Sequence, residues 1–358
     1  MFLKDSKIAI VGGGPGGLAL ARLLQLRGVP VTVYERNRDN AVRVQGATLD
    51  LHAESGLEAL RRAGLLEAFY RAHRPGAGKL RVMDKDANIH LDDHALDIGL
   101  AEDRPEIDRG PLRQLLLDAL QPGTVVWDRQ FVTMESRNSG WMLHFKNGTT
   151  AHADIVIAAD GANSRVRPFL TGIQPVYSGV TIVEGNVYDA ARQAPRLWEL
   201  VKGGKVFAFG SAQSLILSAK GDGSLSFYTG CKVPEAWVRE SGIDFSKKDE
   251  EYRWFREAFA GWNDLWLELF ASDEASFIPR PQYHFPVDQS WEARPDLTLI
   301  GDAAHRMPPY AGEGVNMALQ DAFELADALT GSAFETPAAA IEHYEQGMRE
   351  RAAVVTQM

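Results

Sequence analysis

The sequence lacks several features that would each mark a particular class of protein. Cys231 is its only cysteine, which excludes an intrachain disulfide and a cysteine-based metal site. No apolar run approaches the roughly 20 residues that a membrane-spanning helix requires, so we expect no membrane partner. A net charge of −10 argues against a nucleic-acid-binding surface. The first residues are too Gly-rich for a secretory signal, and we expect a cytoplasmic location.

The rest of the composition is that of an ordinary globular protein. Hydrophobic residues make up 45% of the chain and charged residues 24%, which is typical of a soluble fold. A chain of 358 residues is too long for one simple core, so we expect one large or two interleaved domains. Internal repeats and low-complexity tracts are absent, which excludes repeat architectures.

The most informative stretch lies near the N-terminus. An apolar run over residues 7–11 precedes Gly12-Gly-Gly-Pro-Gly-Gly17, and a helical pattern over 18–27 and a second strand over 31–35 follow. The glycines fill the G-x-G-x-x-G positions between the first strand and the helix. This order is typical of a dinucleotide-binding unit and predicts a ligand with an ADP half, either NAD or FAD.

Each residue of this motif has a separate predicted role. Gly12 permits the tight turn, Gly14 lets the backbone approach a pyrophosphate, and Gly17 lets the helix pack closely on the strand. The helix N-terminus offers unpaired N–H groups and a positive dipole end to the phosphates. Glu35 ends the second strand, where its carboxylate can accept hydrogen bonds from both ribose hydroxyls.

Two later segments decide which dinucleotide is bound. A hairpin around Asn147-Gly148 precedes a buried strand that ends in Asp160-Gly161. A second buried strand ends in Gly301-Asp302, and Pro308-Pro309 and a Gly-rich turn then lead into a helix. These three motifs in this order resemble the single-component flavoprotein aromatic hydroxylases, the para-hydroxybenzoate-hydroxylase-like family. The stretches 33–36, 46–52, 105–113 and 301–316 are similar to its tetracycline-inactivating branch.

The resemblance implies FAD as the cofactor, and the late motifs fit it. Asp302 is placed to hydrogen-bond a ribityl hydroxyl, and the turn that starts the next helix can face the flavin pyrimidine edge, where the helix dipole stabilises the reduced cofactor. The residues expected at the cofactor are Gly12, Gly14, Pro15, Gly17, Glu35, Arg36, Arg43, Asp50, Arg109, Asp160, Asp302, Pro309, Gly312, Gly314, Val315 and Asn316.

Three of these residues have roles that the sequence leaves open. Asp160 contacts FAD or NADPH, or it only caps the next helical turn. Arg109 supplies a cation near the flavin or its phosphates, or it is a surface arginine at a helix start, where a positive charge is mildly unfavourable. The resemblance places Arg43 near the flavin or NADPH.

The likeness to the tetracycline-inactivating branch weakens where the substrate should bind. Strand-like runs between residues 181 and 283 predict a mostly antiparallel sheet whose one face covers flavin and substrate. Glu184, Lys205 and Ser226 stand at the register of that branch's tetracycline-contacting Gln, Arg and His positions. The polar contacts to a tetracycline are therefore largely rewritten, and the sequence leaves the substrate open.

Two remaining features bear on metals and on the reductant. His90-Leu-Asp-Asp-His94 has the ligand types of a metal site but lacks a distant fourth ligand, so we interpret it as a solvated loop and expect no metal. A second G-x-G-x-x-G is absent, so NADPH, with NADH as the alternative, would bind only transiently.

Together these patterns predict an α/β protein with a discontinuous Rossmann-like FAD-binding domain, whose parallel sheet has helices on both faces. This domain takes residues 1–78, 104–175 and 286–332, and a smaller, mostly antiparallel substrate domain takes 79–103 and 176–285. A C-terminal helix over 333–358 completes the chain, and related enzymes continue it further.

The predicted function is that of an NAD(P)H-consuming monooxygenase that oxygenates a cyclic or aromatic small molecule through a flavin C4a-hydroperoxide. A tetracycline-type antibiotic is one candidate substrate, and antibiotic resistance the role that would follow. The cofactor carries the chemistry, so no catalytic acid or base is assigned. The expected partners are the substrate and O₂, and the expected state is a monomer. The alternatives are a flavin reductase or dehydrogenase without oxygen insertion, and a non-catalytic member of the same fold.

Overall fold

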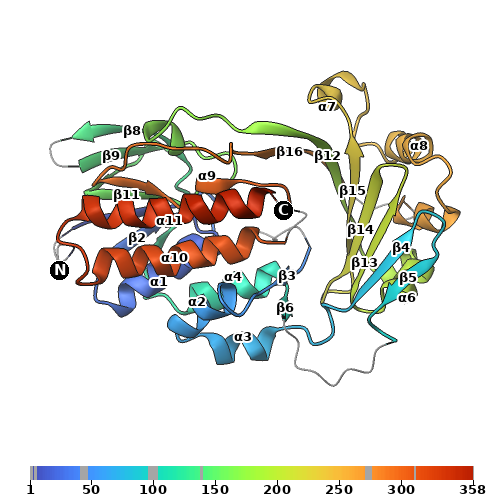
Figure 1. Cartoon of the computed structure of the whole chain (residues 1–358), viewed down its shortest axis with the longest axis horizontal. Coiled ribbons are helices and arrows are strands. Elements are labelled where there is room, and N and C mark those ends of the chain that lie inside the picture. The colour runs from blue at the N-terminus through green and yellow to red at the C-terminus, as the bar shows by residue number, and fades with distance from the viewer. Residues whose placement is uncertain are drawn as a thin grey trace.

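The computed structural model describes residues 3, 6–40, 47–95, 104–137, 140–270, 276–309 and 312–357. Two layers of sheet dominate it, one at each end of the long axis in Figure 1. Each sheet has its own buried hydrophobic cluster. Among the described residues, no helix combines the length and the apolar character that crossing a membrane requires.

The first sheet is parallel and forms the centre of the half that holds both chain ends (Figure 1). Its strands, in spatial order, are β17 (Leu297–Leu299), β11 (Ile155–Ala158), β1 (Ile8–Val11), β2 (Val31–Tyr34) and β7 (Val125–Val126). Strands β1 and β11 are buried along their whole length, as expected for a parallel sheet covered on both faces. The predicted strand, turn, helix and strand of residues 7–35 are confirmed.

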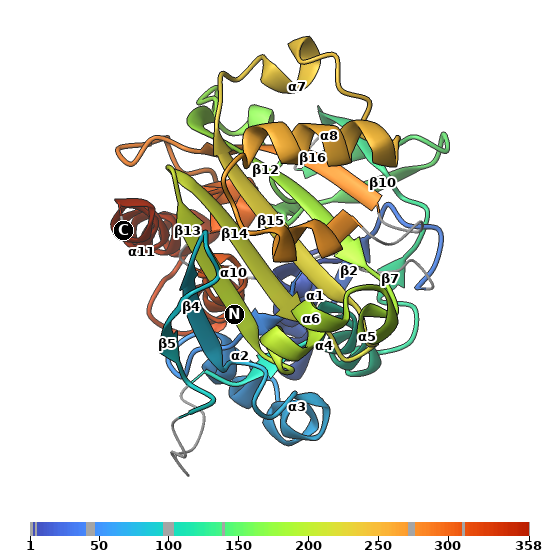
Figure 2. The same cartoon turned by 90° about the vertical axis from the view of Figure 1, so that its right-hand side faces the viewer.

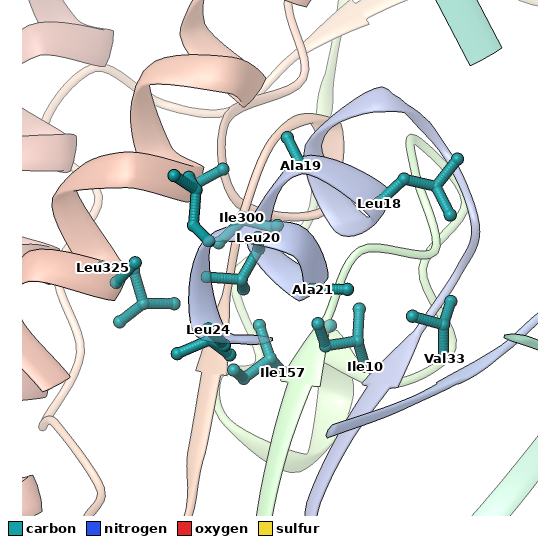
Figure 3. Close-up of a cluster of buried hydrophobic side chains, with 14 of the residues drawn as sticks. Ile10, Leu18, Ala19, Leu20, Ala21, Leu24, Val33, Ile157, Ile300 and Leu325 are labelled. Carbon is teal, nitrogen blue, oxygen red and sulfur yellow. The ribbon is translucent and has the colours of Figure 1, made fainter. Parts of the chain in front are cut away.

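Helices cover one face of this sheet. They are α1 (Pro15–Leu26), α2 (Gly56–Arg62), α3 (Leu66–Ala72), α4 (Arg109–Asp118), α9 (Asp302–His305), α10 (Gly314–Thr330) and α11 (Pro337–Gln357). Figure 3 shows Leu20 and Leu24 of α1 among Ile10, Ile157 and Leu325, which come from the sheet and from α10. The helix that follows the glycine-rich turn therefore packs against the sheet on one side and against α10 on the other.

The other face differs from the prediction of helices on both sides. It is covered by a three-stranded antiparallel sheet of β10 (Thr150–Ala153), β9 (Gly140–Phe145) and β8 (Phe131–Arg137). Neighbouring residues of β2 show this division, because Val33 faces α1 whereas the Tyr34 ring lies 4.9 Å from the Phe145 ring of β9. The predicted Asn147-Gly148 hairpin builds this second layer, and it contributes its aromatic side chains to the common core.

The second large sheet has seven strands and is mostly antiparallel, as predicted. Its order is β16 (Ser276–His284), β12 (Val176–Val187), β15 (Leu225–Lys232), β14 (Gln213–Ala219), β13 (Lys205–Gly210), β4 (Leu80–Asp84) and β5 (Ile89–Asp92). Only the β13–β4 pair is parallel. The expected solvated loop at His90–His94 is largely the edge strand β5. Its first three side chains are exposed, and His90 pairs with Asp84 at 3.1 Å.

Short helices cover the outer face of the seven-stranded sheet, as Figure 2 shows. They are α5 (Ala190–Gln193), α6 (Pro195–Val201), α8 (Lys248–Ala258) and the 3₁₀ helix η2 (Asp264–Phe270), whereas α7 (Trp237–Glu240) lies beyond one end of the sheet. Phe227 and Phe277 of the sheet pack against Phe270 of η2. The centroid of the Phe270 ring lies 6.2 Å from that of Phe227 and 5.0 Å from that of Phe277. Phe227 is therefore a core residue, and the opposite face of the sheet is left for the site.

Two small elements complete the fold. The 3₁₀ helix η1 (Arg167–Phe169) packs its Phe169 ring against Phe131 and Trp141 of the three-stranded sheet. The two-stranded ribbon of β3 (Leu49–Asp50) and β6 (Glu106–Ile107) lies next to the seven-stranded sheet. The predicted division into domains at residues 78, 104, 175 and 286 stays a prediction.

Candidate functional site

A cavity of about 660 Å³ lies between the helical half and the seven-stranded sheet. Its size is in the range of pockets that bind small molecules and cofactors. The cavity is lined by the start of α1, the residues that follow β11, and the β3–β6 ribbon with the start of α4. Residues between β17 and the start of α10 and one face of the seven-stranded sheet complete the lining. The predicted site residues among the lining are Gly14, Pro15, Gly17, Asp50, Arg109, Lys205, Asp302, Pro309, Gly312, Gly314 and Val315.

The glycines of the N-terminal turn are required for different reasons. Gly12 has φ +114°, and a Cβ there would lie 2.2 Å from the Ala159 carbonyl oxygen. A Cβ on Gly17 would lie 2.3 Å from the carbonyl oxygen of Gly12. At Gly14 a Cβ would meet nothing within 4 Å, so this position is open toward the cavity. The first two glycines shape the turn, and the third leaves room for a ligand.

Glu35 lies behind the turn. Its carboxylate is buried and accepts hydrogen bonds from the N–H groups of Gly13 at 2.7 Å and Asn37 at 2.9 Å. Contacts to ribose hydroxyls stay a prediction for Glu35, and so does a cofactor contact for the exposed Arg36, since neither residue is in the cavity lining. Arg43 lies outside the described residues.

Asp160 makes the capping contacts that were one of its two predicted roles. Its Oδ2 accepts hydrogen bonds from the N–H groups of Arg165 at 2.8 Å and Val166 at 3.3 Å. Burial raises the pKa of this carboxyl above its ordinary value. The next residue, Gly161, lines the cavity with φ +80°. Contact of Asp160 itself with FAD or NADPH stays a prediction.

A buried charged cluster supports the second turn. Gly301, with φ +59°, donates its N–H to Asp321 of α10 at 2.8 Å. The same carboxylate binds His305 at 2.6 Å and Arg351 of α11 at 2.9 Å. Burial alone would raise the pKa of Asp321, but the two cationic side chains hold it below its ordinary value. The cluster fixes the turn that presents Asp302 to the cavity.

The start of α10 is tied to the β3–β6 ribbon. The Asn316 side chain accepts a hydrogen bond from His52 N–H at 3.0 Å and donates one to the Asp50 carbonyl at 3.0 Å. Its carboxamide is therefore engaged with the protein, whereas the N–H groups of the first helical turn have no partner within the helix. Arg109, the first residue of α4, donates to the Ala47 carbonyl at 3.0 Å and lines the cavity.

The three predicted substrate residues lie on the same face of the seven-stranded sheet. Lys205 lines the cavity and forms an ion pair with Glu106 of β6. Glu184 is buried and pairs with Arg280 on the neighbouring strand. Ser226 is also buried, between Ser218 and Asn186 in the register of the strands. The structure brings Lys205 to the cavity, and it leaves Glu184 and Ser226 outside the lining.

Sequence reasoning missed several polar residues of the cavity, among them Glu106, Ser218 and Tyr228. Tyr228 accepts a hydrogen bond from Ala47 N–H at 3.0 Å, so its own proton is free to donate. Burial raises the pKa of the Glu106 carboxyl, and the Lys205 ammonium offsets part of that rise. In the sequence, Glu106 stands out only as a carboxylate beside Ile107 in a short strand. Its role is hidden because its partner, Lys205, lies 99 residues away in sequence.

These residues fit a bound FAD. The open position at Gly14 lies at a helix N-terminus, which suits a pyrophosphate. The same cavity runs to Asp302 and the start of α10, where the ribityl chain and the ring would lie. In the described part of the chain, no three His, Cys, Asp or Glu side chains come together as a metal site.

Comparisons with known proteins agree with this geometry. Residues 5–358 match the family described as FAD binding domain. A 3-amino-4-hydroxybenzoate 2-monooxygenase of Streptomyces platensis is 32% identical over 347 residues, covering 95% of this chain and 83% of the relative. A 6-hydroxynicotinate 3-monooxygenase of Pseudomonas fluorescens is 28% identical, with 98% and 90% covered.

Among solved structures, the tetracycline destructase Tet(55) superposes with a TM-score of 0.74 over 98% of this chain and 89% of its own. At 19% identity, this likeness shows a shared fold. The resemblance found in the sequence is thus confirmed at the level of fold and family. The chain belongs to the FAD binding domain family, among the flavin-dependent aromatic monooxygenases.

Proposed function

We propose that this monooxygenase oxidises NADPH, with NADH as the alternative, and uses O₂ to hydroxylate a small aromatic molecule that carries a ring hydroxyl. The observation that carries the proposal is the single cavity that joins the two cofactor turns to a polar sheet face. The named substrates of the two curated relatives, a hydroxybenzoate and a hydroxynicotinate, are hydroxylated rings of this kind.

When bound, FAD supplies electron transfer and the activation of O₂. The Gly12–Gly17 turn would hold its pyrophosphate, and Asp302, Arg109 and the first turn of α10 would hold the flavin end. The sheet face would orient the substrate ring and keep water away from it, with Phe207, Ile182 and Ile216 as apolar walls. Exclusion of water strengthens every polar contact that fixes the ring.

The experiment is to purify the protein, record its visible spectrum and measure NADPH and NADH oxidation, O₂ uptake and hydroxylated product. The panel is 3-amino-4-hydroxybenzoate, 4-hydroxybenzoate, 6-hydroxynicotinate and a tetracycline. We expect a yellow protein whose NADPH oxidation rises with at least one hydroxylated ring. A colourless protein that cannot be reconstituted with FAD would overturn the proposal. Stimulated oxidation without hydroxylated product would favour the reductase alternative, and turnover of the tetracycline alone would favour an antibiotic substrate.

A further inference from the structure

A polar row crosses the cavity face of the seven-stranded sheet. The strand register places Lys205 opposite Ser218, Ser218 opposite Ser226, and Ser226 opposite Asn186. These residues come from β13, β14, β15 and β12, which lie side by side in Figure 2. In the next row along the strands, Phe207 lies opposite Ile216, and Tyr228 lies opposite Glu184. Next to Lys205 the polar row is therefore bordered by apolar side chains, whereas the far end of this face stays polar.

Several atoms around this row are buried without a protein partner. Glu106 Oε2, Ser226 Oγ and Asn186 Oδ1 have no hydrogen-bond partner within the described residues, and all three side chains are more than nine-tenths buried. Buried polar groups are almost always hydrogen-bonded in folded proteins, so each of these atoms requires an explanation. Glu106 is the most informative, because it is a carboxylate that lines the cavity.

The ion pair at the end of the row presents two different hydrogen-bonding groups side by side. Lys205 Nζ donates to Glu106 Oε1, which leaves further ammonium protons on one side and the unpartnered Oε2 on the other. The two charges compensate each other, so the pair is not by itself an anion site. Its chemical complement is a ligand with a proton donor next to an oxygen acceptor.

We propose that the Glu106–Lys205 pair selects an aromatic substrate that carries a ring hydroxyl oxygen and a neighbouring N–H or O–H donor, as in an ortho-aminophenol. The substrate oxygen accepts from Lys205 Nζ, and the neighbouring group donates to Glu106 Oε2. This inference rests on the proposed function, since it names the substrate class of the same cavity. Ser218 extends the polar floor beside the pair.

The test is calorimetric titration of the FAD-loaded protein with three matched probes. 3-Amino-4-hydroxybenzoate has both groups, 4-hydroxybenzoate lacks the amine, and 3-amino-4-methoxybenzoate replaces the hydroxyl by a methoxy group. We expect the first probe to bind at least about tenfold more tightly than each of the others, because a site built for hydrogen bonds rejects ligands that leave its groups unpaired. Equal affinities for the three probes, or no binding of any of them, would overturn the inference.

Two variants assign the selectivity to the pair. In Glu106→Gln the amide oxygen can keep the contact to Lys205, and the NH₂ group then faces the donor of the ligand. We expect about a tenfold loss for 3-amino-4-hydroxybenzoate and less than about a threefold change for 4-hydroxybenzoate. Lys205→Met should weaken both of these hydroxylated probes.

Asp92→Asn is the matched control, because it neutralises the Arg81–Asp92 ion pair of the same sheet outside the cavity lining. It should leave all three affinities unchanged. The FAD content and thermal stability of each variant show whether it is folded, and the Lys205 variant keeps the test open if Glu106→Gln fails to load FAD. Unchanged affinity for 3-amino-4-hydroxybenzoate in every variant that loads FAD would contradict the inference.

The two proposals fail in different ways. If the wild-type protein hydroxylates rings without discriminating among the three probes, the assigned pair is wrong and the monooxygenase function stands. If it binds the probes selectively but forms no hydroxylated product, the selection stands and the proposed function fails.

Discussion

The two sides of the cavity are built by opposite means. On the helical side, the surface is mainly backbone, because glycines remove side chains at the turns after β1 and β17 and leave N–H groups at helix starts. On the sheet side, the surface consists of side chains projecting from strands, as at Lys205 and Tyr228. A backbone surface tolerates little change and suits one invariant ligand. A side-chain surface can be rewritten without disturbing the fold, and it suits a ligand that differs between relatives.

The largest expected effect concerns the buried charge behind the backbone surface. Asp321→Ala should lower the free energy of unfolding by about 5 kcal/mol, because it leaves His305 and Arg351 buried without their anion and frees the Gly301 N–H. Urea unfolding measures the loss. The control is Asp327→Ala on the same helix, where the carboxylate is half-exposed and the loss should stay within about 1 kcal/mol. Equal losses would show that the cluster does not support the turn.

A slightly smaller effect is expected at the first turn. Gly12→Ala should cost about 4 kcal/mol of stability and abolish retention of FAD, because the added methyl meets the Ala159 carbonyl and the backbone has φ +114°. Thermal unfolding and the flavin absorbance of the purified protein measure the two effects. Gly110→Ala is the control, since a Cβ there meets nothing within 4 Å and alanine favours the helix α4. A stable, yellow Gly12→Ala protein would contradict the role given to the turn.

The stability of the helical side should depend on pH through one buried carboxyl group. Burial raises the pKa of Glu345 on α11 to about 7, from an ordinary value near 4.5. The folded protein therefore binds this proton more tightly than the unfolded chain does. The stability that this group contributes is complete below pH 4.5 and is lost as the pH rises through about 7.

That loss should amount to about 3 kcal/mol, since each pKa unit corresponds to about 1.4 kcal/mol. Glu345→Gln should remove this dependence, so its stability relative to the wild type should rise by about the same amount between pH 4.5 and 8. The measurement is urea unfolding at several pH values. Glu350→Gln, on the exposed side of α11, should leave the pH dependence of the wild type unchanged. A parallel pH dependence in the wild type and Glu345→Gln would show that Glu345 is charged in the fold.

The smallest expected effect on stability is at Gly14, and it tests directly whether the backbone there binds FAD. Gly14→Ala should leave the stability of the FAD-free protein within about 0.5 kcal/mol, since a Cβ meets no protein atom within 4 Å and φ is −78°. The affinity for FAD should fall at least about tenfold, because the methyl group occupies the approach to the pyrophosphate. Flavin fluorescence titration measures the affinity. An unchanged affinity would place the pyrophosphate elsewhere.

The same contrast explains how far the sequence predicts the structure. The Gly12–Gly17 turn and the strands around it follow from neighbouring residues, because glycine spacing indicates the turn and apolar runs indicate the strands. The Glu106–Lys205 pair depends on a ribbon and a sheet that meet only in the folded chain. The expectation of helices on both faces of the parallel sheet was wrong. The sequence indicates the Asn147-Gly148 hairpin, but it does not indicate that this hairpin packs on β2. Substrate contact stays a prediction for Glu184, and its pairing with Arg280 could not be inferred from either strand alone.

The central claim is that an oxygen atom passes between the two sides of this cavity into an aromatic ring. The most direct measurement is turnover under ¹⁸O₂ with NADPH and 3-amino-4-hydroxybenzoate, followed by mass spectrometry of the product. We predict one ¹⁸O atom in each molecule of hydroxylated product. A product whose new oxygen comes from water, or NADPH oxidation that ends only in hydrogen peroxide across the whole panel, would contradict the account.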